Sequence, residues 1–152
     1  MIPGPAPQGQ KQAAAPSGRA ALPPGSPEEQ FKYAFDFLKA NDYQKGEQAM
    51  QSFVEAHPNH ALTGNAHYWL GQIHYVAKDY PKAAVSFATS YEKFPDGSKA
   101  PDSLLRLGQS LAALNKKPEA CAAYKQLGTQ YPTAVPALKQ SAQSEIARLG
   151  CK

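Results

Sequence analysis

Three prolines, Pro58, Pro95 and Pro132, each follow an aromatic residue or a histidine, and they lie 37 residues apart. A constant interval of this size is typical of helical repeat proteins, in which each unit is a pair of helices stacked on the next pair. The interval therefore predicts three helix-turn-helix units and an all-α fold.

Other positions keep the same register. Leu70-Gly71 recurs as Leu107-Gly108, and a series of small residues is followed four residues later by bulky ones: Gly46, Ala83 and Ala120 precede Met50, Phe87 and Tyr124. This arrangement resembles the tetratricopeptide repeat. The resemblance implies a right-handed superhelix of three repeats, at about 27–60, 64–97 and 101–134, with a capping helix at 135–149. It assigns inter-helix packing to Gly71, Ala83, Phe87, Pro95, Gly108, Ala120, Tyr124 and Pro132.

The usual tetratricopeptide unit has 34 residues, so an interval of 37 places about three extra residues in the loops between units, where added length costs little entropy. Ser26, Pro27 and Glu29 have the spacing of an N-cap, a first-turn proline and a capping-box acid. We therefore expect helices at 27–40, 43–57, 62–77, 80–94, 98–114, 118–130 and 134–149.

Residues 1–26 contain six of the 14 prolines and have no apolar period, which predicts a flexible linker ahead of one repeat domain at 27–152. Lys11 and Arg19 supply half of the net charge of +4. The balanced charge of the remainder argues against a nucleic-acid partner. No apolar run is long enough to insert into a membrane, and the start does not look like a signal peptide. We expect a soluble chain, cytosolic or the processed part of an exported protein.

The first helix of each tetratricopeptide unit lines the concave face of the superhelix. Carried onto this sequence, that rule predicts an exposed partner-binding surface in which aromatic side chains anchor a peptide and amides bond its backbone. The residues predicted to form it are Phe31, Phe35, Asn65, Tyr68, Gln72, Tyr75, Asp102, Leu105 and Gln109. The alternative is that Tyr68 and Tyr75 only cover gaps within the helix.

Metal and enzyme chemistry are disfavoured. His74 occupies a packing position of the repeat, and the other histidines lack Cys or carboxylate partners for a four-ligand site. The sequence contains no nucleophile elbow, phosphate-binding glycine loop or zinc-protease helix. We expect no catalytic residue, no metal and no cofactor.

Cys121 and Cys151 are the two cysteines. The first lies near the start of the sixth predicted helix and the second just past the end of the seventh, which runs antiparallel to it. Antiparallel packing would bring them within reach of a disulfide that pins the last helix, given an oxidising compartment. The alternative is two unrelated thiols.

Over about 28–151, the sequence resembles the C-terminal repeat domain of the Tol-Pal associated YbgF/CpoB family. The segments that carry the resemblance are NAHYWLG, KDYPKAA, a following FP and the ending ARLGC. The family implies a periplasmic adaptor of Gram-negative bacteria that contacts TolA and a bifunctional peptidoglycan synthase and coordinates wall synthesis with outer-membrane constriction. Members also carry a signal peptide and a trimerising coiled coil. The coiled coil of the family implies that the parent protein is a trimer, and because neither segment is seen here, we expect this chain to be a monomer.

Four other functions stay open. A cytosolic adaptor that captures a chaperone's C-terminal carboxylate would need Lys and Asn where this chain has residues such as Tyr68 and Gln109. An outer-membrane assembly lipoprotein would need a lipidated N-terminal Cys. A generic repeat adaptor for another peptide needs neither feature, and an enzyme is the remotest alternative.

Overall fold

In a computed structural model of the chain, which describes residues 21–152, the described part contains seven α-helices and no strand. The all-α prediction is confirmed. The described part of the chain divides into two compact units, residues 21–60 and 61–152. Most of the predicted linker, 1–26, lies outside the described residues.

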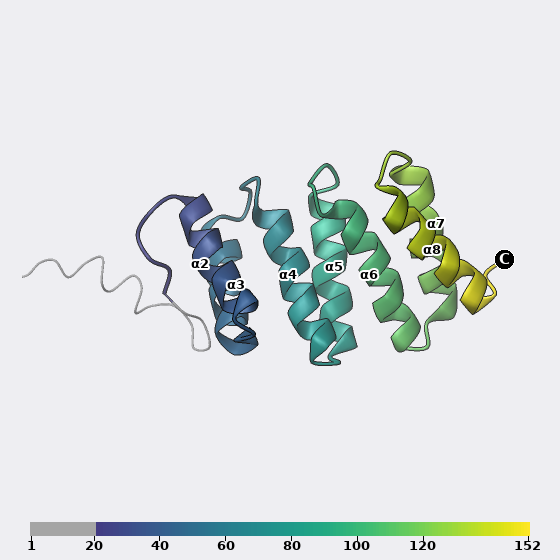
Figure 1. Cartoon of the computed structure of the whole chain (residues 1–152), viewed down its shortest axis with the longest axis horizontal. Coiled ribbons are helices and arrows are strands. Elements are labelled where there is room, and N and C mark those ends of the chain that lie inside the picture. Colours follow the sequence, from purple (N-terminus) through teal and green to yellow (C-terminus); the bar gives the residue numbers. More distant parts are fainter. Residues whose placement is uncertain (1–20) are drawn as a thin grey trace, which may run out of the picture. The chain divides into compact units, whose positions relative to one another are not determined.

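The first unit contains one helix pair, α2 (Pro27–Lys39) and α3 (Tyr43–Ala56) (Figure 1). α2 begins with the predicted capping box, in which the Ser26 hydroxyl accepts from the Glu29 amide and the Glu29 carboxylate accepts from the Ser26 amide. The two helices pack through Ala34 and Phe53, which are fully buried. Gly46 leaves room for Leu38 between them.

The second unit contains five helices: α4 (Thr63–Val76), α5 (Tyr80–Lys93), α6 (Ala100–Ala113), α7 (Lys117–Gln130) and α8 (Pro136–Leu149). Each packs on the next in chain order, and α6 also touches α4 and α8 (Figure 1). The predicted helix bounds hold to within two residues. α4, α6 and α8 therefore lie next to one another in one row.

The turn inside each helix pair has the same backbone conformation. Asn41, Lys78 and Asn115 occupy equivalent places, and all three have a positive φ of 61° or 62°. Asparagine tolerates this left-handed conformation better than most residues, whereas lysine does not favour it. The backbone conformation of the turn therefore recurs at the same 37-residue interval as the sequence pattern.

In both pairs of the second unit, an aromatic ring lies against a glycine. A Cβ added at Gly71 would stand 2.6 Å from the ring of Phe87, and one added at Gly108 would overlap the ring of Tyr124. Both rings are buried. Close approach of the helices therefore depends on these two glycines.

Two buried serines connect α4, α5 and α6. The Ser90 hydroxyl donates to the Gly64 carbonyl at 2.8 Å, and the Ser103 hydroxyl donates to Ser90 at 2.8 Å. Ser90 and Ser103 are at most 1% exposed. Because their hydroxyls have partners, burying them carries little penalty and orients the three helices.

α8 closes the core of the second unit. Ala142 is buried against Tyr124 and Leu127, with Leu138 and Ile146 packed around it. Gly150, at φ 68°, ends the helix in the left-handed conformation that favours glycine. The last helix therefore covers the end of the core, as its apolar stripe predicts.

Candidate functional site

α4, α6 and α8 line an open cavity of about 290 Å³, which we call the groove. It is lined by residues from all three helices: Tyr68, Asp102, Leu105, Arg106, Gln109, Leu138 and Ser141. The predicted concave surface contributed four of these, Tyr68, Asp102, Leu105 and Gln109. The structure thus brings them together, although their role in binding a partner stays a prediction.

Two of the four are less exposed than we expected. Tyr68 is 7% exposed and Leu105 is 8% exposed. The Tyr68 ring packs on Phe87, with ring centroids 5.7 Å apart, and Leu105 belongs to the core that contains Tyr124. The expectation that both side chains are exposed is therefore wrong, because a neighbouring helix covers most of each one. Only their edges face the groove.

Charged side chains surround the Tyr68 ring. The Lys99 ammonium lies 5.1 Å from the ring centroid and 5.6 Å from that of Trp69. Burial raises the pKa of the Tyr68 hydroxyl and the Asp102 carboxylate raises it further, whereas Arg106 opposes the shift. The hydroxyl therefore stays neutral at physiological pH and lies near both Asp102 and Arg106.

A chain of polar contacts crosses the other end of the groove. The Arg106 guanidinium lies 5.2 Å from the Tyr75 ring centroid and donates to Gln109 at 3.1 Å. Gln109 donates to Glu145 at 3.3 Å, and Arg148 donates to the same carboxylate at 2.9 Å. These contacts link α4, α6 and α8 beside the groove, and of the side chains involved Arg106 and Gln109 line it.

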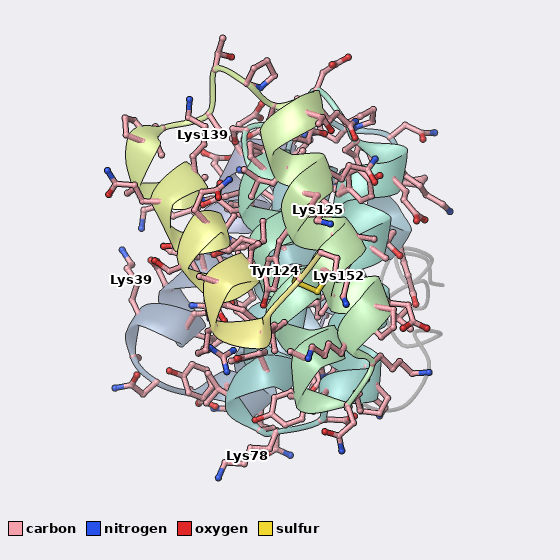
Figure 2. All side chains as sticks on the ribbon, turned by 90° about the vertical axis from the view of Figure 1, so that its right-hand side faces the viewer. Lys39, Lys78, Tyr124, Lys125, Lys139 and Lys152 are labelled. Atoms are coloured by element: carbon pink, nitrogen blue, oxygen red, sulfur yellow. A yellow bond between two sulfur atoms is a disulfide. The ribbon has the colours of Figure 1, made fainter. Side chains whose placement is uncertain are left out.

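Two buried polar atoms in this region have no hydrogen-bond partner within residues 21–152: Gln72 Oε1 and the Tyr124 hydroxyl. Burial raises the pKa of the Tyr124 hydroxyl, and the Glu145 carboxylate adds to the shift. Figure 2 shows Tyr124 between α7 and α8. A buried polar atom without a partner costs about 1 to 3 kcal/mol, so both atoms are destabilising as they stand.

Family models agree with this arrangement. Residues 34–98 match a model described as a tetratricopeptide repeat, and residues 102–134 match a second model with the same description. The chain belongs to the tetratricopeptide repeat family. Stacked tetratricopeptide hairpins form surfaces that bind other proteins, and the chain is accordingly a protein-interaction adaptor.

The chain is also similar to two curated sequences from Pseudomonas putida, one of them from strain KT2440, both named cell division coordinator CpoB. The identity is 39% over 59 residues. The match covers 37% of this chain and 22% of the relatives' length. The similarity therefore supports a CpoB-like tetratricopeptide domain.

The remaining predicted contact residues lie apart from the groove lining. Asn65, at the start of α4, accepts from the Ser98 hydroxyl at 3.3 Å. Phe31 and Phe35 belong to the first unit, where they stack with centroids 6.2 Å apart and Phe31 also meets Phe53. The structure places these two phenylalanines within their own tetratricopeptide hairpin only.

Sequence reasoning missed Arg106, Ser141 and Glu145. Arg106 follows Asp102 by four residues, so helical spacing alone would have placed it on the same face. Ser141 and Glu145 lie on the capping helix, which was expected only to close the core. Their contribution follows from α8 packing beside α6, and no tetratricopeptide motif encodes that placement.

A disulfide joins Cys121 on α7 to Cys151 just after α8, with the two Cα atoms 5.7 Å apart (Figure 2). The expectation of a bridge is confirmed. Because α8 supplies Leu138 and Ser141, the bridge fastens one wall of the groove to the last tetratricopeptide hairpin.

Within the described residues, no group of three or more His, Cys, Asp or Glu side chains is arranged to hold a metal ion. Across the same part of the chain, no helix combines the length and apolar character that a bilayer-spanning segment requires.

Proposed function

We propose that this chain is a periplasmic adaptor of the Tol-Pal system, which coordinates outer-membrane constriction with peptidoglycan synthesis during cell division. Support comes from its similarity to the cell division coordinator CpoB of P. putida. The Cys121–Cys151 disulfide agrees with this compartment, because such bonds persist in oxidising surroundings such as the periplasm.

The observation that carries the adaptor role is the groove between α4, α6 and α8. It combines apolar side chains, Leu105 and Leu138, with charged ones, Asp102 and Arg106. Binding sites for protein segments have this composition, in which apolar anchors supply affinity and a few polar groups fix orientation. We propose the groove as the contact site for TolA and for a bifunctional peptidoglycan synthase.

The test is a calorimetric titration of the full chain with the periplasmic part of TolA, without reductant. Saturable binding is expected. Ser141→Trp should weaken it at least about tenfold, since a large ring would fill the groove. Gln143→Trp is the matched control, because Gln143 is also exposed on α8 but does not line the groove.

Both variants should melt at the temperature of the unmodified chain. An absence of TolA binding up to about 100 μM, which corresponds to less than about 5.5 kcal/mol of binding free energy, would refute the Tol-Pal assignment. The chain would then be an adaptor for another protein partner. Binding that is equally strong in the Ser141→Trp variant would instead place the contact outside the groove.

A further inference from the structure

Two opposite charges in the groove have no ionic partner. Asp102 and Arg106 lie one turn apart on α6, and no oppositely charged group lies within 4.0 Å of either among residues 21–152. Asp102 also has no side-chain hydrogen bond in this part of the chain. A carboxylate and a guanidinium are therefore both available to a ligand.

The other charges around the groove are already engaged. Lys99 lies over the rings of Tyr68 and Trp69, and Arg148 is paired with Glu145. Arg106 itself is oriented by the Tyr75 ring, by Gln109 and by the Tyr68 hydroxyl, which together use one face and part of a group that has five donors. Its remaining donors suit a carboxylate, which guanidinium binds in a two-pronged geometry.

Apolar surface lies between the two charges. Leu105 precedes Arg106 on α6, and Leu138 faces it from α8. The groove thus presents a carboxylate, the edge of Leu105 together with Leu138, and a guanidinium in succession. Equal numbers of positive and negative free charges make this a poor site for a nucleic acid or an anionic membrane, both of which attract surfaces of one sign.

The spacing of Asp102 and Arg106 along α6 favours a helical ligand. Residues four apart on a helix lie about 6 Å apart along its axis and share one face. A ligand that matches the groove must present a base, an apolar side chain and an acid on one face over the same distance. A helix does this, whereas in an extended chain the residue between two same-face side chains points away.

We propose that the groove binds an amphipathic helix of a partner protein that carries an acidic and a basic residue four positions apart, with an apolar residue between them on the same face. The acid of the partner meets Arg106, the base meets Asp102, and the apolar side chain lies against Leu105 and Leu138. This inference rests on the proposed adaptor function and adds the chemistry of the segment that the adaptor recognises.

The probes are three capped helical peptides of about 18 residues, long enough to be helical on an alanine-glutamine carrier. Each has one leucine, flanked on the same face by Glu then Lys, by Lys then Glu, or by two glutamines. The first two have identical composition, so net charge cannot separate them. One charge order should bind at least about fivefold more tightly than the other two peptides.

The decisive variant exchanges the two charges, Asp102→Arg with Arg106→Asp. It keeps the net charge of the groove and should prefer the opposite peptide order. The control exchange, Glu119→Lys with Lys125→Glu, alters two exposed residues of α7 outside the groove and should keep the original preference. Circular dichroism checks that both variants keep their helices.

The proposal is overturned if none of the peptides binds, if all three bind equally, or if the groove exchange leaves the preferred order unchanged. Sedimentation of the chain alone is a second check. A dimer that the Asp102→Arg variant loses would assign the groove to a second copy and also overturn the proposal.

The peptides contain no TolA sequence, so their binding tests the recognition chemistry independently of the Tol-Pal assignment. An order preference without TolA binding would keep the recognition chemistry and remove the assignment. TolA binding that is unchanged in the groove exchange variant would keep the Tol-Pal assignment and contradict the recognition chemistry.

Discussion

The hairpins α4–α5 and α6–α7 follow one steric plan with different chemistry. In both, a ring covers a glycine, Phe87 on Gly71 and Tyr124 on Gly108. The first hairpin has a capping Asp79 at the start of its second helix, whereas the second has Lys116, whose side chain makes no cap. The second hairpin alone is tied by a disulfide to α8.

The difference shows which parts of a repeat are constrained. Contacts set by volume recur, because helices in a close-packed interior tolerate few changes in size. Capping, which affects one helix end by about 1 kcal/mol, is lost where another interaction compensates. In this molecule the hairpin that lacks the cap on its second helix is the one that the bridge from Cys121 ties to the end of α8.

Removing the bridge should have the largest effect. It closes a loop with a sequence separation of 30, and the chain-entropy model gives a loss of about 3 to 4 kcal/mol for such a loop. Cys151→Ser should lower the free energy of unfolding by this amount in urea denaturation. Reductant should destabilise the unmodified chain similarly and leave the variant unchanged. Equal stability with and without the bridge would show that α8 packing alone holds the hairpin.

The two glycines come next. Gly71→Leu and Gly108→Leu should each destabilise by about 2 to 3 kcal/mol, because the added side chain meets a buried ring in a packed interior. Gly128→Ala on α7 is the matched control, since a Cβ there meets nothing within 4 Å. It should stabilise the helix by about 0.5 to 1 kcal/mol. An unchanged melting midpoint for either leucine variant would contradict the repeat register.

The same steric constraint explains how far the sequence predicts this fold. Proline, glycine and small-residue positions recur because they are set by close packing, so they predicted seven helices with bounds within two residues of those observed. The cysteines were informative for a similar reason, since antiparallel helices bring few residue pairs into reach. Lys78 in a left-handed turn was not predictable, because nothing about lysine favours that conformation.

The groove was only partly predictable. Helical periodicity gives the face on which Tyr68 and Leu105 lie, but the depth of each depends on the neighbouring helix that covers it. Ser141 and Glu145 entered the site only through the packing of α8 beside α6. Both gaps concern contacts between elements far apart in sequence, which periodicity within one helix cannot supply.

A smaller effect is expected when the hydroxyl is removed from one of the two rings that cover the glycines or added to the other. Tyr124→Phe removes a buried hydroxyl without a partner and should stabilise by about 1 kcal/mol, whereas Phe87→Tyr adds one and should cost about 1 to 3 kcal/mol. Urea denaturation at neutral pH measures both. A destabilised Tyr124→Phe would show that the hydroxyl has a partner, such as an ordered water.

The same variant predicts a pH dependence. Burial raises the pKa of Tyr124 in the folded chain above the unfolded value of about 10. A raised pKa contributes stability that is complete below the unfolded value and is lost as the pH rises above it. Tyr124→Phe should therefore lose less stability than the unmodified chain above about pH 10. Parallel pH profiles would mean that Tyr124 ionises as readily when folded.

The smallest expected effect concerns the missing cap. Lys116→Asp places a carboxylate where Asp79 caps α5, so it should accept from the amide of residue 119 and stabilise α7 by about 0.5 to 1 kcal/mol. Asp79→Ala should cost about 1 kcal/mol in the other hairpin. Because a cap stabilises the folded helix, the gain in stability from Lys116→Asp should be the same with and without reductant. A gain that appears only in reductant would instead show that the bridge and the cap stabilise the same local opening of α7.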